Sequence, residues 1–482
     1  MRTASAAIAA GLCLLALGGL AAPAGGSRPL RTAIVGGGTF YGRDSDLSFA
    51  RSRAAGATAI RLQLSWREIA PATRPSGFDP TNPADPAYRW GMFDQLVEKA
   101  IGHGVTPFIG ISDAPPWAER GSGGRPGTNR PDPVELGNFA EAAARRYSGG
   151  FNGLPRVHTW EVWNEPNGSF FLYPQLNGNR AISPGIYRSM VNRFAAAVHR
   201  VHADNRVVAG ALFPFSLAKP TVQAVGPLRF MRALLCMTKR LRPGRRCGGP
   251  VHFDIWSDHP YTSGDPTHRA QDSDSVSIHE LPKMRALLRA AVRFKRVVHN
   301  RRGVPFWVTE FSWDTNPPDP GGVPQRLHGR WVAEALYRMW RAGVSLVTWF
   351  QLRDDVANGK PNSSTFQSGL YNHCDGGMAC DTPKPALRAF EFPFVAFRSG
   401  QRRARVWGRL PPRVRGRVVV EQFSGGLWRA VGRARSNRRG IFARRVRLKG
   451  RGSLRARPVA PGPTSLSFSL KRPPDLRVNP FG

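Results

Sequence analysis

Cysteine is scarce in this chain, with only five among 482 residues. Cys13 lies near the amino terminus, and the other four form two neighbouring pairs along the sequence, Cys236 with Cys247 and Cys374 with Cys380. These spacings are not the short ones typical of structural zinc sites. We therefore expect two disulfides formed in an oxidising compartment, and a four-cysteine metal site is the less favoured alternative.

Long apolar runs are absent beyond the first residues, so no later segment is expected to cross a bilayer. Residues 1–24 have the pattern of a secretory signal. Arg2 is followed by an uncharged stretch of small and apolar residues up to Leu20, and Ala22-Pro23-Ala24 has the small-x-small form of a cleavage site. We expect a secreted, extracellular protein that has no membrane attachment once the signal is removed.

Acidic residues are few, with 32 Asp and Glu against 70 Lys and Arg. Residues 398–482 alone carry 23 basic and two acidic side chains. A surface of one sign attracts polyanions, so an acidic cell-wall polymer is a possible partner of this region. Nucleic acid is not expected, because the region has few aromatic side chains that could stack on bases. A nucleotide cofactor is not expected either, because Gly36-Gly37-Gly38 lacks the lysine and the glycine spacing of a phosphate-binding loop.

Apolar runs alternate with helix-period segments between residue 30 and about residue 395. This pattern predicts βα units, and eight of them predict a (β/α)8 barrel over residues 25–397. Six strands are expected at 33–35, 58–64, 105–111, 206–212, 253–256 and 344–350, and the other two carry Glu165 and Glu310. Residues 398–482 lose the helix period and predict a small β-sandwich with a loose tail. Its strands are expected at 405–410, 417–423, 428–434, 442–448 and 465–470.

Two glutamates stand where predicted strands end. Glu165 lies in Trp160-Glu161-Val162-Trp163-Asn164-Glu165-Pro166-Asn167, where Pro166 cannot continue a strand ladder. Glu310 closes the apolar run that begins at Val304. The carboxyl ends of parallel barrel strands meet at one face, so the two side chains are expected to converge there. A pair of carboxyl groups in one cleft is what the hydrolysis of a glycosidic bond requires.

The segment Trp160 to Asn167 resembles the fourth-strand motif of clan A glycoside hydrolases, especially families 5 and 39. Thr309-Glu310-Phe311 resembles the nucleophile motif on their seventh strand. The resemblance covers residues 30 to about 395. It implies a barrel that hydrolyses β-glycosidic bonds in poly- or oligosaccharides with retention, uses no metal or organic cofactor, and has Glu165 as acid/base and Glu310 as nucleophile.

The same resemblance gives roles to other residues. Arg61 and Tyr261 are expected to hold Glu310 ionised, Asn164 to bind the sugar 2-hydroxyl, and Trp349 to form the floor of the sugar site. Trp117 and His259 are further candidates for substrate contact, because aromatic faces stack on sugars and barrel-rim loops carry function. A turn cap for Asn164, core packing for Trp117 and a structural role for His259 are the alternatives. We expect Glu161 to be an internal hydrogen-bond partner.

The sequence leaves a second interpretation open. The chain could be a catalytically inactive carbohydrate- or cell-wall-binding protein built on the same barrel. The sugar and the linkage are not specified by any segment of the sequence.

Overall fold

The computed structural model describes residues 28–219, 221–245, 248–300, 303–412, 414–473 and 475–480. The predicted signal, residues 1–24, lies outside this range, and so does Cys247 of the predicted Cys236–Cys247 disulfide. Within the described range, no helix has both the length and the apolar character needed to span a membrane.

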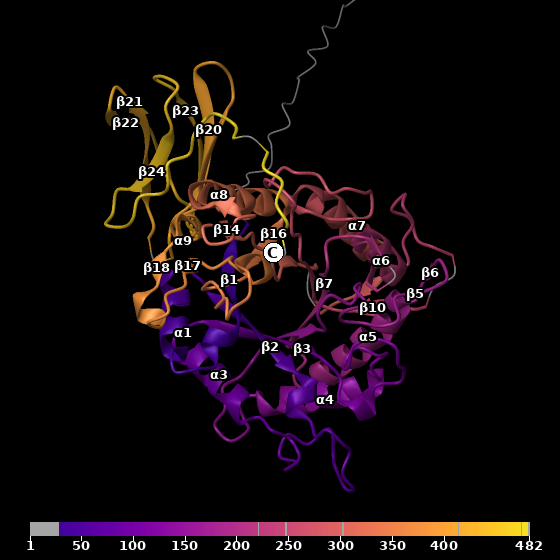
Figure 1. The fold of residues 1–482 in the computed structure, drawn as a ribbon. Coiled ribbons are helices and arrows are strands. Elements are labelled where there is room, and N and C mark those ends of the chain that lie inside the picture. The colour runs from indigo at the N-terminus through magenta and orange to yellow at the C-terminus, as the bar shows by residue number, and fades with distance from the viewer. Residues whose placement is uncertain are drawn as a thin grey trace, which may run out of the picture.

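Eight parallel strands close into a barrel in the order β1-β16-β13-β11-β7-β4-β3-β2. The strands form the centre of Figure 1 and the helices surround them. This is the predicted (β/α)8 fold. The barrel strands are β1 Arg31–Gly36, β2 Ala59–Ser65, β3 Thr106–Ser112, β4 Thr159–Val162, β7 Arg206–Leu212, β11 Ile255–Asp258, β13 Phe306–Val308 and β16 Val344–Trp349.

Most of the longer helices bury an apolar stripe against the barrel. In α3, Phe93, Leu96, Val97 and Ala100 recur at helical spacing and are all buried. Helix α4 begins where the Asp132 carboxylate accepts hydrogen bonds from two backbone N–H groups of the first turn. The helices are α1 Ser45–Ala54, α2 Trp66–Ile69, α3 Gly91–Gly102, α4 Pro133–Arg146, α5 Ser183–Val201, α6 Pro227–Leu235, α7 Leu281–Arg293, α8 Gln325–Ala342 and α9 Pro385–Glu391.

The inside of the barrel has an apolar layer and a polar layer above it. The apolar layer consists of Ala33, Ala59, Phe108, Val208, Ile255, Trp307 and Leu346. Side chains two residues apart on a strand share a face, so Arg61 follows Ala59 into the interior and Ser257 follows Ile255. Both side chains are buried and contact Glu161 from β4. The strand period therefore supplies a polar platform directly beneath the carboxyl ends of the strands.

The C-terminal module is a β-sandwich of two antiparallel three-stranded sheets, β19-β20-β23 and β22-β21-β24. Its strands are β19 Phe394–Arg398, β20 Arg403–Arg409, β21 Arg417–Ser424, β22 Leu427–Arg435, β23 Ile441–Arg447 and β24 Leu454–Pro458. The strand expected at 465–470 does not form, and Phe468 makes only an isolated bridge with Leu454. Strands β19 and β24 were not expected. The first strand of the sandwich therefore begins at Phe394, four residues before residue 398, where the sequence predicts the module to start.

The remaining strands of the described residues are two residues long and pair two by two in the connections between the main elements. They are β5 Leu176–Asn177, β6 Arg180–Ala181, β8 Leu217–Ala218, β9 Gln223–Ala224, β10 Val251–His252, β12 Val297–Val298, β14 Thr315–Asn316, β15 Val323–Pro324, β17 Tyr371–Asn372 and β18 Thr382–Pro383. The predicted Cys374–Cys380 disulfide is present, with an S–S distance of 2.01 Å, and it closes the loop between β17 and β18. A zinc site that uses these two cysteines is thereby excluded.

The C-terminal tail leaves the sandwich and returns to the barrel mouth, where the yellow segment in Figure 1 ends. His268 Nδ1 and Asp475 Oδ2 lie 2.8 Å apart, and the Val478 N–H donates to the Ser263 carbonyl at 3.2 Å. Both barrel residues belong to the loop that follows β11. The tail thus connects the sandwich to the rim of the barrel.

Candidate active site

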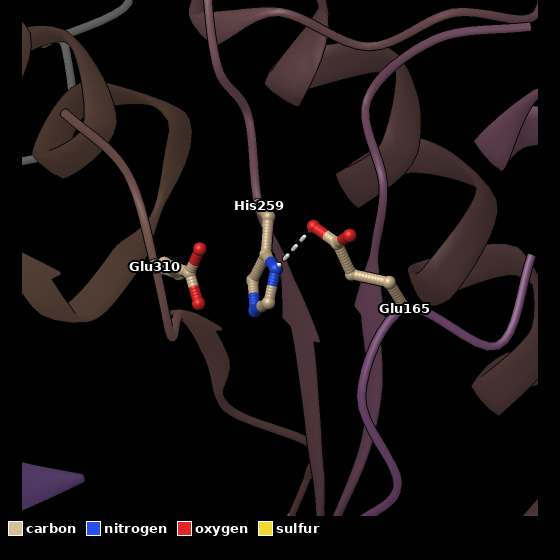
Figure 2. A group of neighbouring side chains, drawn as sticks. All are labelled: Glu165, His259 and Glu310. Atoms are coloured by element: carbon tan, nitrogen blue, oxygen red, sulfur yellow. Dashed lines mark hydrogen bonds and ion pairs between the residues drawn. The ribbon is translucent and has the colours of Figure 1, made fainter. Parts of the chain in front are cut away.

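The two glutamates follow strands β4 and β13, which are separated in the barrel by β7 and β11. Glu165 comes after β4 in a tight turn where Trp163 and Glu165 have φ angles of 66° and 39°. The Glu165 N–H donates to the Ala211 carbonyl at 2.9 Å, which ties the turn to β7. Left-handed backbone at non-glycine residues is uncommon and clusters at functional sites. Glu310 follows β13 and faces the same cleft (Figure 2).

The carboxyl groups of Glu165 and Glu310 lie close together. One oxygen of each, together with a ring nitrogen of His259, lies within 4.8 Å of the others. Retaining glycosidases keep their two carboxyl groups about 5–5.5 Å apart, whereas inverting enzymes leave about 6.5–9.5 Å for a water molecule. One oxygen of each group within 4.8 Å of the other is compatible with the shorter separation, at which one carboxylate attacks a carbon held between the two.

Two donors hold Glu310. Arg61 Nη1 lies 2.9 Å from Glu310 Oε2, and the Tyr261 hydroxyl donates to Glu310 Oε1 at 2.6 Å. Burial raises the pKa of Glu310, while the Arg61 guanidinium and the Tyr261 hydroxyl act in the opposite direction. Burial and the Glu310 charge also raise the pKa of Tyr261, so the phenol stays neutral and donates. The net direction is upward, so Arg61 and Tyr261 favour the ionised form of Glu310 but offset only part of the effect of burial.

Besides Glu310, two further groups hold Arg61. Its Nε donates to Glu161 at 2.6 Å, and its Nη2 donates to Asn164 Oδ1 at 2.8 Å. Glu161 also accepts from the Ser257 hydroxyl at 3.2 Å. Glu161 is fully buried and acts as the expected internal hydrogen-bond partner. Ser257 was not anticipated from the sequence, because a serine inside a strand carries no distinguishing pattern.

The pKa of Glu165 is shifted in the same direction but more strongly. Burial raises its pKa well above the ordinary value, and the negative charge of Glu310 raises it further. His259 Nδ1 lies 2.9 Å from Glu165 Oε1 (Figure 2), and His259 Nε2 lies 3.2 Å from the Thr309 hydroxyl. Burial lowers the pKa of His259 well below its usual range, so the imidazole is neutral. Glu165 is thus the carboxyl group better suited to hold a proton.

The structure places Trp349 away from the carboxylates. Leu346 faces the barrel interior, so Trp349, three residues later on β16, faces outward. Its ring packs against His328 of α8 and Phe390 of α9, and the side chain is fully buried. Trp349 is therefore not positioned to form the floor of a sugar site. The next residue, Phe350, continues the inward-facing set and packs on Phe366 with ring centroids 4.9 Å apart.

Trp117 lies in an aromatic cluster at the rim. Its indole N–H donates to the Pro71 carbonyl at 2.8 Å, and its ring contacts Trp66 and Phe78. Arg74 lies over the same ring at 5.4 Å. Trp117 is half-buried, so part of its surface is open to solvent while the rest packs in the cluster.

The trio Glu165, His259 and Glu310 offers oxygen and nitrogen atoms close enough together for a divalent cation. The donor set fits a cation poorly, however. Both oxygens of Glu310 already accept hydrogen bonds, one of them from a guanidinium that repels a metal ion. The arrangement instead fits chemistry that moves a proton and forms a bond to carbon.

No protein-family model and no curated protein matches the chain. Among solved structures, it is similar to a family 39 glycoside hydrolase from Bacteroides cellulosilyticus WH2. The two chains are 16% identical, with a TM-score of 0.54 over 88% of this chain and 82% of that one.

Two further structures are more distant. A glucosidase from Croceicoccus marinus is 15% identical, with a TM-score of 0.47 over 87% of this chain and 93% of its own. A family 30 endoxylanase from Clostridium papyrosolvens C71 is 12% identical, with a TM-score of 0.44 over 87% and 94%. The chain therefore shares its fold with the family 39 glycoside hydrolase of Bacteroides cellulosilyticus WH2.

Proposed function

We propose that the chain is a secreted retaining β-glycosidase that hydrolyses poly- or oligosaccharides by double displacement. The observation that carries the proposal is the approach of Glu165 and Glu310 to within 4.8 Å across one cleft. Their unlike surroundings support unlike roles, because Glu310 is held by a cation and a phenol while Glu165 is next to a neutral imidazole.

In the first step, the Glu310 carboxylate attacks the anomeric carbon and the bond to the leaving oxygen breaks. Glu165 gives its proton to that oxygen, and a glycosyl ester on Glu310 results. Esterification removes the negative charge of Glu310, so the pKa of Glu165 falls. Glu165 can then take a proton from water as the water oxygen attacks the anomeric carbon and frees Glu310. The sum is one water molecule consumed and one glycosidic bond cleaved.

Other residues prepare these steps. Arg61 and Tyr261 hold Glu310 ionised and orient both of its oxygens. Asn164 accepts a hydrogen bond from Arg61 and directly precedes Glu165 in the sequence, and its motif assigns it to the sugar 2-hydroxyl. His259 contacts Glu165 Oε1 and orients that carboxyl group, and its ring lies between the two glutamates in Figure 2. A purely sugar-binding barrel would not need this division between the two carboxyl groups, and no contact in the site favours that alternative.

Secretion is part of the proposal. It rests on the signal-like pattern of residues 1–24, and the Cys374–Cys380 disulfide is in keeping with an oxidising compartment. The β-configuration rests on the two motifs around Glu165 and Glu310. Localisation of the full-length chain in its own host, before and after deletion of residues 1–24, tests secretion separately from activity.

Turnover of a panel of aryl β-glycosides and wall polysaccharides tests the catalytic assignment. Glu165→Gln and Glu310→Gln are each expected to lower kcat by at least about 10²-fold with an unchanged unfolding midpoint. Azide separates the two roles. With an activated aryl glycoside, azide is expected to rescue Glu165→Ala and give a β-glycosyl azide, and to rescue Glu310→Ala and give the α-anomer. Full activity in either glutamine variant would end the proposal.

A further inference from the structure

The C-terminal sandwich has an unusually uniform charge on the sheet β19-β20-β23. Strands β20 and β23 pair so that Arg403 stands opposite Arg447 and Arg405 stands opposite Arg445. All four side chains are exposed. Like charges directly opposite each other in a sheet are destabilising. This arginine ladder therefore lowers the stability of the sheet, and the fold itself does not explain it.

A cavity of about 820 Å³ continues the ladder at one end. Its charged lining is entirely basic and consists of Arg398, Arg402, Arg447, Lys449 and Arg451. Arg447 belongs to both features, and the Leu448 N–H donates to the Arg402 carbonyl, which joins the two sides of the cavity. The ladder and the cavity therefore form one continuous surface, which we call the arginine surface.

No acidic side chain of the module neutralises the arginine surface. Residues 398–482 contain only two, Glu421 and Asp475. Glu421 pairs with Arg455 and Arg457 on the other sheet, and Asp475 contacts His268 on the barrel. Within the described part of the chain, no carboxylate lies within ion-pair distance of any residue of the arginine surface. The guanidinium groups are thus available to an external anion.

The arrangement of these cations indicates an extended ligand. Same-face residues along a strand are about 6.6 Å apart, and residues opposite each other across a ladder are about 5 Å apart. A grid at that spacing suits a chain of regularly repeated anions better than a single ion. Arginine forks bind carboxylates and phosphates through paired hydrogen bonds. The lining of the cavity contains no aromatic ring on which a base could stack.

We propose that the arginine surface binds a linear anionic wall polysaccharide, whose repeated carboxylate or phosphate groups contact Arg402, Arg403, Arg405, Arg447 and Arg451. The preference for a polysaccharide over a nucleic acid rests on the proposed glycosidase function and on the absence of stacking rings. The binding itself does not depend on catalysis, because the surface lies on the sandwich and the carboxylate pair lies in the barrel.

Binding of the full-length Glu165→Gln chain to defined polymers tests the proposal without hydrolysis. The probes are polygalacturonate, a poly(glycerol phosphate) and neutral dextran, titrated between 20 and about 300 mM salt. The two charged polymers separate a carboxylate ligand from a phosphate ligand. Two double variants, Arg403→Gln/Arg447→Gln and Arg402→Gln/Arg451→Gln, are each expected to weaken binding of the preferred polyanion by at least about tenfold at low salt.

The matched control is Arg429→Gln/Arg433→Gln, which removes two exposed arginines from β22 on the other sheet of the same module. It changes the net charge equally and is expected to weaken binding less than about threefold, as screened long-range attraction alone would do. An equal loss in the control would show diffuse attraction and overturn the proposed surface. Failure to bind either polyanion would overturn it too, and tighter binding of duplex DNA at the same salt would overturn the polysaccharide assignment.

Discussion

Arg61 connects two carboxylates and an amide of the candidate site. One guanidinium contacts Glu161, Glu310 and Asn164 with its three nitrogens, and it lies almost fully buried within β2. A buried cation between two carboxylates is stable because each supplies a charge-assisted hydrogen bond, and the pKa of Arg61 is raised accordingly, although burial acts in the opposite direction. The ionisation of Glu310 therefore depends on a residue that does not react.

Replacing Arg61 by Met is expected to lower kcat/KM by about 10²–10³-fold, because a preorganised charge next to the reacting carboxylate is lost. Glu310 must be ionised to attack. Without the guanidinium its pKa rises, so the acidic limb of the kcat/KM profile is expected to move to higher pH. The pH dependence of kcat/KM measures this shift.

Arg61→Met also leaves Glu161 buried without its cation, which can unfold the protein. Arg61→Met/Glu161→Gln removes that charge as well, and it is compared with Glu161→Gln alone because the Glu161 charge itself raises the pKa of Glu310. An acidic limb at the same pH in the folded double variant and in Glu161→Gln would contradict the role assigned to Arg61.

The residues around the carboxylate pair could largely be predicted, because all but Arg61 follow a strand end next to a recognisable motif. Glu165, Glu310, Arg61, Asn164, His259 and Tyr261 lie together at one site, as the sequence predicts. The sequence predicts Trp349 in the sugar site, whereas in the structure its ring faces the helices. The face that the last residue of a strand occupies depends on the register of the strand. Its partner on β1 is Ile34, which packs outside the barrel, whereas Thr348 is opposite the inward-facing Ala33.

At the scale of elements, the loops that follow β13 and β16 are held together by a buried lysine. Lys384 Nζ contacts Asp354 Oδ1 at 2.6 Å, the Thr315 hydroxyl at 2.7 Å and the Gln367 carbonyl at 3.0 Å. Lys384 directly precedes α9, so it joins three segments of the rim. One of these loops begins just after Glu310, and the other just after Phe350. The position of the cleft walls thus depends on a contact outside the cleft.

Lys384→Met is expected to lower the free energy of unfolding by about 3–5 kcal/mol, because it leaves the Asp354 carboxylate buried without its cation. The comparison is Lys360→Met, which removes an exposed lysine from the loop that follows β16, the loop that carries Asp354. It is expected to change the free energy of unfolding by no more than about 0.5 kcal/mol. Denaturant unfolding with a constant m-value measures both. Equal effects of the two variants would show that the buried contact has no special role.

At the scale of the whole molecule, the barrel was more predictable than the sandwich. Barrel strands are buried on both faces and appear as near-continuous apolar runs between amphipathic helices. Strand β24 is Leu-Arg-Ala-Arg-Pro, in which the buried positions are small or weakly apolar and arginine dominates. Residues 465–470 alternate more clearly, yet they lie beside β24 with a single bridge. Sheet pairing depends on neighbours that the local sequence does not show.

The tail is expected to be docked in solution as it is in the structure. Asp475→Ala removes the contact with His268 and the hydrogen bond from the Asp265 N–H, so trypsin is expected to cleave after Arg477 about two- to fivefold faster. Mass spectrometry of the fragments over time measures the rate. Asp375→Ala, which alters a fully exposed acid near the Cys374–Cys380 disulfide, is the control and should cleave like the parent protein.

The docking of this tail has a mechanical consequence. Asp475 contacts the Asp265 N–H and His268. This segment begins only a few residues after Tyr261, whose hydroxyl donates to Glu310. A force that separates the sandwich from the barrel would therefore act, through only a few residues, on Tyr261 and its hydrogen bond to Glu310. If the sandwich is bound to a polymer under tension, turnover is expected to fall before the sandwich detaches. Binding and hydrolysis therefore work together only while the force is low.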